Sequence, residues 1–197
     1  MAIFFAGREL IDIAVGIERS GAAFYDYLAE STKKAKPEIM SSHLAGKEAK
    51  GRTTHSASKE TKIRTMYSEL AAREREHIQT FQNLLGPAGE YPNPDAYAEE
   101  YALYLNSLVD SAVFKNERSA SEAAQKVASE LEAVEIGIRA EKDSILFYSA
   151  IQDLIRRADA NLIGGIIKEE KGHLAQLSDL KRRLSKSPRS KQSTRGK

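Results

Sequence analysis

The sequence predicts an all-α protein, an antiparallel four-helix bundle with one long crossover between the second and third helices. Its 197 residues include 29% charged residues, 12 Gly, 5 Pro and no Trp, a composition typical of long helices with solvated outer faces. Apolar residues also recur every three or four positions along the long segments, which is the periodicity of a helix with one buried face. Because 41% of the residues are hydrophobic, one domain over residues 1–185 can bury a full core.

The first helical hairpin is predicted from residues 8–31 and 59–85. Pro87 follows a glycine directly after the second helix, and this pair ends it because proline cannot continue the helical hydrogen bonding. Residues 32–58 between the two helices are rich in Lys, Gly and small polar residues. We therefore expect a long polar loop there, with one short helix over residues 39–44.

The second hairpin is predicted from residues 129–157 and 160–185. Its first helix starts at a serine that is followed three residues later by glutamate, the spacing of a capping box. Residues 87–128 form the crossover between the hairpins, and we expect short helices within it at residues 97–109 and 122–128. Two hairpins of long helices joined by one long crossover form a known bundle topology.

Charge and composition also limit the partners and the location. The net charge is +2, and the basic residues concentrate in a tail over residues 186–197, which we expect to be disordered chain in solvent. The absence of cysteine excludes disulfides and thiolate metal sites. The N-terminus lacks the basic start of a signal peptide, and no apolar run is long enough to span a bilayer. We expect a cytoplasmic protein without nucleic-acid or membrane partners.

The two predicted hairpins repeat one pattern of acids, histidines and aromatics. In each half, a lone glutamate is followed six residues later by Phe-Tyr, and the next long helix carries a Glu-x-x-His motif. These elements are Glu18 and Glu74-x-x-His77 in the first half, and Glu141 and Glu170-x-x-His173 in the second. Two such halves related by a pseudo-twofold axis would place all six side chains around one centre.

The four glutamates lie inside apolar stripes, as Glu18 does beside Ile11 and Ala14. A buried carboxylate without a partner is costly, and four facing one another would cost more. Two divalent cations would balance the four charges, with the lone glutamates bridging or chelating. Carboxylates with one imidazole per ion suit iron or manganese, and the same ligand set is known from di-iron and di-manganese bundles. We therefore predict a two-metal site with six ligands.

Two further tyrosines share the faces of the lone glutamates. Tyr25 and Tyr148 lie two turns after Glu18 and Glu141. Two interpretations stay open: both are ordinary core tyrosines, or both are functional residues of the site that hydrogen-bond ligating carboxylates. The remaining histidines and several acids are expected on the solvated surface, although one of these acids adjoins a predicted ligand: His43, His55, Glu69, Glu76, Glu135 and Glu169.

These motifs resemble the rubrerythrin branch of the ferritin-like di-iron carboxylate superfamily over about residues 6–31 and 59–185. The resemblance implies a ferritin-like bundle with a non-haem centre of two Fe ions per chain, with Mn or Zn as alternatives in purified protein. It implies the six ligands predicted above, a reaction with hydrogen peroxide or O2, and a homodimer.

The sequence departs from that branch in three places. The rubredoxin-like domain with its four-cysteine iron is absent, so electrons would come from an external electron-donor protein. Ser144 stands where rubrerythrins carry an additional glutamate, which weakens the case for a peroxidase mechanism in which one iron shifts between ligands. The segment 32–58 is also longer than the usual first hairpin loop.

From these observations we expect a rubrerythrin-like oxidoreductase that reduces hydrogen peroxide or O2, with a role in oxidative stress or iron homeostasis. One alternative is an iron-binding protein of ferroxidase type that handles iron without peroxidase turnover. A further alternative is a metal-free structural bundle.

Overall fold

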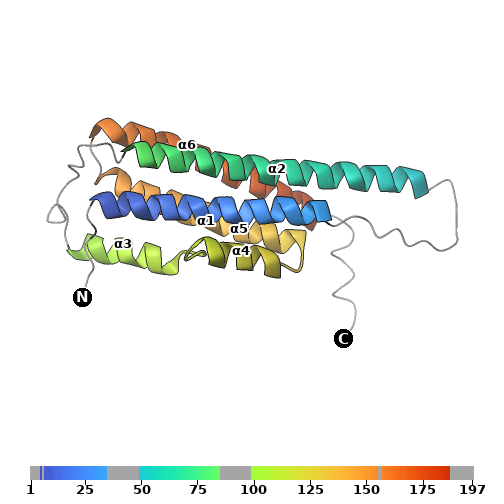
Figure 1. Ribbon diagram of the computed structural model, residues 1–197, viewed down its shortest axis with the longest axis horizontal. Coiled ribbons are helices and arrows are strands. Elements are labelled where there is room, and N and C mark those ends of the chain that lie inside the picture. Colours follow the sequence, from blue (N-terminus) through green and yellow to red (C-terminus); the bar gives the residue numbers. More distant parts are fainter. Residues whose placement is uncertain (1–4, 6, 35–48, 85–98, 155–156, 187–197) are drawn as a thin grey trace.

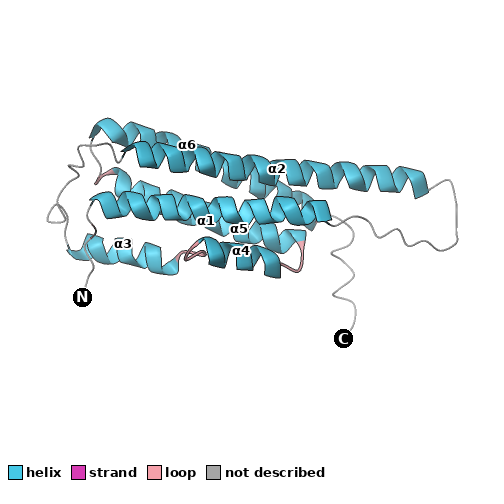
Figure 2. Cartoon of the chain, viewed as in Figure 1, coloured by secondary structure: helices cyan, strands magenta, loops and turns pink. Residues whose placement is uncertain are grey.

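The computed structural model describes residues 5, 7–34, 49–84, 99–154 and 157–186, and this part of the chain is helical, with no strand (Figures 1 and 2). None of its helices is long and apolar enough to cross a membrane. The helices, in chain order, are α1 (Gly7–Lys34), α2 (Ala49–Leu84), α3 (Glu99–Ser111), α4 (Glu117–Lys126), α5 (Glu130–Gln152) and α6 (Arg157–Ser185).

The four long helices α1, α2, α5 and α6 form the predicted bundle, and two short helices lie along its outside. α1 packs against α2, and α5 packs against α6, so each hairpin of the sequence is a hairpin of the structure. In Figure 1, α3 and α4 run end to end beneath the bundle, where α4 packs on α1 and α3 packs on α5. The all-α four-helix bundle predicted from the sequence is confirmed.

The predicted loop between the first two helices is shorter than expected. α1 continues to Lys34, and α2 begins at Ala49 rather than at residue 59, so residues 49–58 are helical. This stretch has no apolar stripe to reveal it, but extending an existing helix is far less costly than nucleating one. The short helix expected at residues 39–44, His43, the His55 side chain and most of the tail lie outside what is described.

The ends of the later helices follow local capping chemistry. α4 begins at Glu117, earlier than the expected residue 122, because Asn116 caps it: its side chain accepts a hydrogen bond from the Ser119 backbone N at 2.9 Å. The predicted cap of α5 is confirmed, since Ser129 Oγ accepts from the Glu132 N–H at 3.2 Å. α5 ends at Gln152 and α6 begins at Arg157, so the break between them lies a few residues before its expected place.

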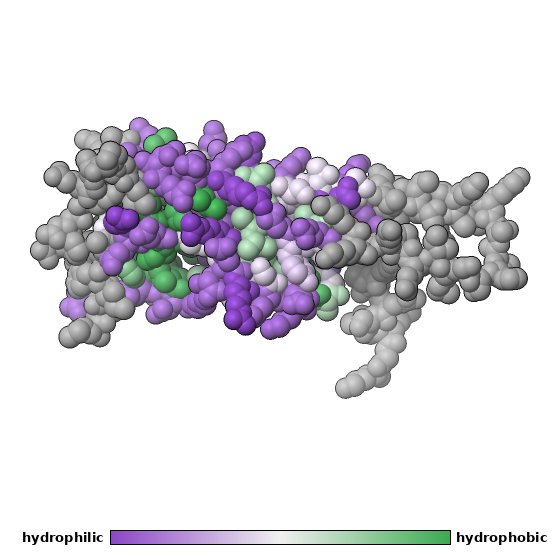
Figure 3. Space-filling model, viewed as in Figure 1, coloured by the Kyte–Doolittle hydropathy of each residue, from purple (hydrophilic) through white to green (hydrophobic). Residues whose placement is uncertain are grey.

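Two apolar clusters fill the bundle, one toward each end. One contains large side chains such as Ile11, Phe81 and Ile163, and the other contains Phe24, Leu70 and others. In the antiparallel bundle, these clusters leave a layer between them at the middle of the long helices. Figure 3 shows that the visible face is mostly hydrophilic, with apolar residues gathered in limited areas. The layer between the clusters holds the buried polar residues described next.

Candidate metal centre

All six predicted ligands are buried in the middle of the bundle. Each is exposed by 6% or less, although Glu and His are residue types normally found at the surface. Each of the four long helices contributes: Glu18 from α1, Glu74 and His77 from α2, Glu141 from α5, and Glu170 and His173 from α6. The structure therefore brings together all six side chains that the repeat in the sequence singled out.

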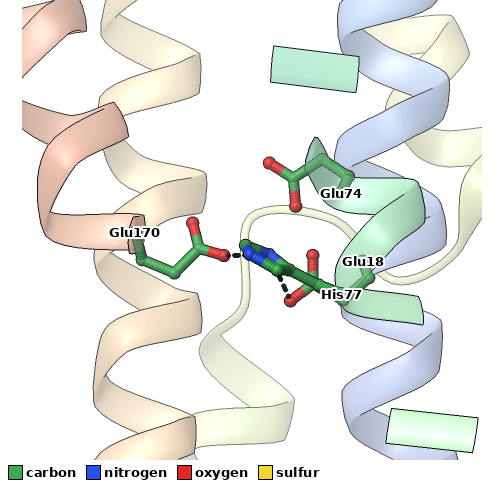
Figure 4. Close-up of side chains that lie close together, drawn as sticks. All are labelled: Glu18, Glu74, His77 and Glu170. Carbon is green, nitrogen blue, oxygen red and sulfur yellow. Dashed lines mark ion pairs between the residues drawn. The ribbon is translucent and has the colours of Figure 1, made fainter. Parts of the chain in front are cut away.

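The six side chains form two overlapping groups that could each hold a metal ion. The first group is Glu18, Glu74, His77 and Glu170, shown in Figure 4, and the second is Glu74, Glu141, Glu170 and His173. Within each group, one donor atom per residue lies within 4.8 Å of all the others. Only Glu74 and Glu170 belong to both groups, so the geometry favours these two carboxylates as bridges and gives Glu18 and Glu141 one position each.

The helical spacing explains how each Glu-x-x-His motif serves the centre. Residues three apart lie on one helix face, and His173 Nδ1 accordingly lies 3.1 Å from Glu170 Oε2 on the same helix. His77 Nδ1 lies 2.8 Å from Glu170 Oε1 and 3.5 Å from Glu18 Oε1. Both imidazoles therefore present Nδ1 to the carboxylates, and their rings stack with centroids 5.9 Å apart.

The two tyrosines form a crossed pair of hydrogen bonds between α1 and α5. Tyr25 Oη donates to Glu141 Oε1 at 2.5 Å, and Tyr148 Oη donates to Glu18 Oε1 at 2.7 Å. Each tyrosine thus bonds the glutamate of the other half. Both rings also pack within the apolar clusters. The two interpretations left open by the sequence therefore coexist, because each tyrosine fills the core and orients a carboxylate of the centre.

Two helix glycines make room for these side chains, and the sequence analysis did not single them out. A Cβ at Gly21 would lie 3.2 Å from Glu74 Cδ, and a Cβ at Gly137 would lie 3.1 Å from Tyr25 Oη. A glycine inside a helix costs about 1 kcal/mol relative to alanine, and at these two positions it permits a close approach that a Cβ would hinder. The sequence alone does not reveal this, because a Cβ at another helix glycine, Gly165, would meet nothing within 4 Å.

The pKa values of the four acids of the centre shift in different directions. Burial, followed by the charges of neighbouring carboxylates, raises the pKa of Glu74 well above its ordinary value, and burial does the same for Glu18. Burial and the hydrogen bond with Glu170 raise the pKa of Glu141 to about 8. Burial also acts to raise the pKa of Glu170, but its close contacts with Glu141, His173 and His77 outweigh burial and lower that pKa. Of the four glutamates, Glu170, which belongs to both groups, therefore keeps its negative charge most readily.

The histidines take up protons in the absence of a cation. Burial acts to lower their pKa, but the carboxylates around them have the larger combined effect. Glu170 and its neighbours raise the pKa of His77 to about 9, and Glu141 and Glu170 raise that of His173 to about 10. The two protonated imidazoles therefore supply positive charge at the positions where metal ions would supply it.

The donor set fits metal ions on a second, independent observation. Among the described side chains, three buried polar atoms form no hydrogen bond, and all three are in this centre: Glu18 Oε2, His77 Nδ1 and Glu170 Oε1. The last two lie 2.8 Å apart, but their contact does not have the geometry of a hydrogen bond. Buried polar atoms almost always have a hydrogen-bond partner. Three atoms without one, all of types that ligate metals and all in this centre, therefore fit the binding of a cation.

The acids predicted for the solvent face are exposed, but one of them also reaches the centre. Glu69, Glu76 and Glu135 are exposed as expected. Glu169 has a half-exposed side chain, and its Oε2 lies 3.2 Å from His77 Nε2. Sequence reasoning noted only that Glu169 adjoins a ligand, because its contact is to a histidine on another helix.

The comparisons with known proteins support the fold. A crystal structure from Thermotoga maritima, of a protein described as a candidate ferritin-like diiron-carboxylate protein, superposes with a TM-score of 0.56. The two sequences are 24% identical, and the match covers 92% of this chain and 98% of that chain. No protein-family model and no curated protein matches this sequence.

In the metal-free protein, the free energy of unfolding should fall as the pH rises from about 5 to 10. The folded-state pKa values of Glu141, His77 and His173 lie above their ordinary values of 4.5 and 6.5. Such groups contribute stability that is complete below the unfolded-state pKa and is lost as pH rises through the folded-state pKa. Urea unfolding of chelator-treated protein across this range measures the effect. Glu141→Gln should flatten the fall below pH 8, and stability that rises with pH would contradict the assignment.

Gly137→Ala should destabilise the protein, because the new Cβ would press on Tyr25 Oη and on Leu177 Cδ1 at 3.3 Å. Overpacking of this kind costs about 1–3 kcal/mol, less the gain of about 1 kcal/mol from replacing a helix glycine. Gly165→Ala is the matched control, because nothing lies within 4 Å of its Cβ, and it should stabilise by about 1 kcal/mol. Equal urea midpoints for the two variants would show that Tyr25 is not held against α5.

Proposed function

We propose that this chain is a non-haem di-iron protein of rubrerythrin type that reduces hydrogen peroxide or O2. The observation that carries the proposal is the pair of buried ligand groups that share Glu74 and Glu170. Four carboxylates and two imidazoles around two positions suit iron or manganese better than a structural zinc ion. When bound, two ferrous ions would together supply the two electrons needed to cleave an O–O bond.

The side chains around the ligands support this chemistry by holding the carboxylates and limiting water. The Tyr25 hydroxyl holds Glu141, and the Tyr148 hydroxyl holds Glu18, so that each carboxylate keeps one oxygen directed by a hydrogen bond. Both tyrosines keep their phenolic protons, because burial and the nearby carboxylates raise the pKa of each phenol well above its ordinary value. Apolar clusters on both sides of the layer restrict access of bulk water.

A small cavity gives access to the centre from the face formed by α1 and α5. It has a volume of about 30 Å³ and is bordered by Gly21, Glu74, Glu141 and Ser144. That volume holds one or two water-sized molecules, which fits peroxide or O2. A second cavity of about 190 Å³ shares wall residues with the first and extends to Lys115, toward the outside of the crossover.

The second candidate function is iron handling of the ferroxidase type, and Ser144 favours it. The Ser144 hydroxyl donates to the Ala140 carbonyl at 3.1 Å, so this side chain is occupied by its own helix. It does not replace the additional carboxylate that rubrerythrins carry at this position. Ferrous ions as the substrate would require oxidation followed by release, whereas peroxide as the substrate would require repeated re-reduction by an external electron-donor protein. The rubrerythrin-type proposal also includes a cytoplasmic location, assembly into a homodimer and a role in oxidative stress.

Protein loaded with two Fe²⁺ per chain should be oxidised within seconds when hydrogen peroxide is added without oxygen, with ferric absorption appearing in the near ultraviolet. A peroxidase would keep consuming peroxide when a chemical reductant is supplied, whereas an iron-handling protein would release ferric ion after one round. Glu74→Ala should abolish two-metal loading, because it removes a ligand common to both groups. Arg8→Ala, an exposed change at the start of α1, serves as the control.

Failure to load iron, or loaded iron that peroxide leaves ferrous, would remove the redox proposal. A melting temperature that is unchanged by metal would favour the metal-free structural bundle instead, because a ligand that binds only the folded state must stabilise it.

Ser144→Leu should slow oxidation by peroxide several-fold without changing the number of irons bound. The larger side chain would fill the cavity beside Glu141 while leaving all six ligands intact. Overpacking would cost about 1–3 kcal/mol of stability, so folding is checked by thermal unfolding. Ser107→Leu places the same side chain on an exposed position of α3 and should oxidise at the normal rate. Equal rates for both variants would show that the oxidant takes another path.

A further inference from the structure

The two halves of the centre differ at the residue that precedes each Glu-x-x-His motif. In α6 this residue is Glu169, whereas in α2 the equivalent residue is Arg73. The six ligands themselves obey the pseudo-twofold relation, with one lone glutamate, one Glu-x-x-His motif and one tyrosine from each half. An acid and a base therefore stand at equivalent positions, beside a set of six ligands that is itself symmetric.

Glu169 contacts the outer nitrogen of His77. The imidazole directs Nδ1 toward Glu18 and Glu170, as Figure 4 shows, and its Nε2 lies 3.2 Å from Glu169 Oε2. A carboxylate can only accept a hydrogen bond, so it selects the tautomer whose proton is on Nε2. That tautomer leaves the Nδ1 lone pair free for a cation, and the carboxylate also increases the basicity of the ring.

His173 has no such partner within the part of the chain that the structure describes. Its Nδ1 also points inward, 3.1 Å from Glu170 Oε2, but no described side chain hydrogen-bonds its outer nitrogen. The surface hollow beside His173 is bordered by Arg73 and Glu76. Arg73 cannot accept a hydrogen bond, and it is held 2.6 Å from Glu76 by an ion pair. The charged residues that border this hollow are thus Glu69, Arg73 and Glu76, and no hydrogen bond joins any of them to His173.

We propose that Glu169 makes the two metal positions unequal, so that the position of His77 binds a divalent cation more tightly and fills first. Glu169 acts as a positioning residue, through His77 and without touching the ion. This inference rests on the proposed function insofar as both require metal binding, but it does not depend on the reaction. Partners of ligating histidines commonly change metal affinity by 10–100-fold. Because the Glu169 side chain is 53% exposed, we expect an effect near tenfold.

Titration of the metal-free protein with Co²⁺, followed by calorimetry and visible absorption, tests the inference. The unaltered protein should bind two ions per chain in two resolved steps. Glu169→Gln should weaken the tighter step by about tenfold and leave the weaker step in place, which brings the two affinities together. Glu76→Gln is the matched control, because it removes an exposed carboxylate by the same substitution on the His173 side, and it should leave the tighter step unchanged.

A spectroscopic measurement separates positioning from a general change in charge or folding. In Zn²⁺-loaded protein labelled with ¹⁵N, the Nε2 proton of His77 should exchange with solvent more slowly than that of His173. Glu169→Ala should abolish this difference while the protein still folds and unfolds cooperatively, because the side chain is half-exposed and fills no core space.

The outcomes distinguish this inference from the proposed function. Two equal steps in the unaltered protein, or equal shifts of the tighter step in Glu169→Gln and Glu76→Gln, would overturn the inference and leave a di-metal protein. Unequal steps that respond only to Glu169 would support the inference, even if peroxide fails to oxidise the iron-loaded protein. If no Co²⁺ binds at all, both the inference and the proposed function are wrong.

Discussion

Four carboxylates buried at one level of the bundle are the constraint on which the rest of the structure depends. Isolated in an apolar core, each would cost several kcal/mol or take up a proton. Without a cation, burial raises the pKa values of Glu18, Glu74 and Glu141, and the carboxylates raise those of the two histidines. Because successive residues of a helix point about 100° apart, a shift of one residue in any long helix would turn its ligand away from the centre.

The crossed tyrosine bonds fix the relation between the two hairpins. α1 and α5 belong to different halves of the sequence, yet Tyr25 bonds Glu141 and Tyr148 bonds Glu18. The bonds tie the two helices together at the level of the ligands. Gly137 supports this arrangement by letting the Tyr25 hydroxyl approach α5 closely. Polar contacts therefore hold the side chains of the centre in place, and the apolar clusters on either side limit the access of water to these contacts.

The centre presents two different sides to its surroundings. On the side of α1 and α5, a small cavity bordered by Ser144 leads under the crossover segment that connects α3 to α4. Asp143 accepts a hydrogen bond from the Val113 N–H at 2.8 Å and so holds this segment against α5. On the side of α2 and α6, the outer edges of the histidines meet charged surface residues. The cavity and the charged surface residues therefore lie on different sides of the centre.

The sequence by itself determined the four long helices and all six candidate ligands, because both follow from local periodicity. An acid at a core position of an amphipathic helix is visible in a single chain, and repetition of the pattern in each half made it specific. It also located the cap at Ser129, whose hydrogen bond spans three residues. The early starts of α2 and α4 were missed, since helix extension and an asparagine cap need no apolar stripe.

Only the tertiary structure decided how the parts relate across helices. It decided which glutamates are shared between the two groups, which tyrosine bonds which carboxylate, and that Glu169 contacts His77. These relations join different helices, which meet only in the folded chain. Spacing along one helix fixes the face of a side chain, but the partner opposite that face depends on the register of the packed helices.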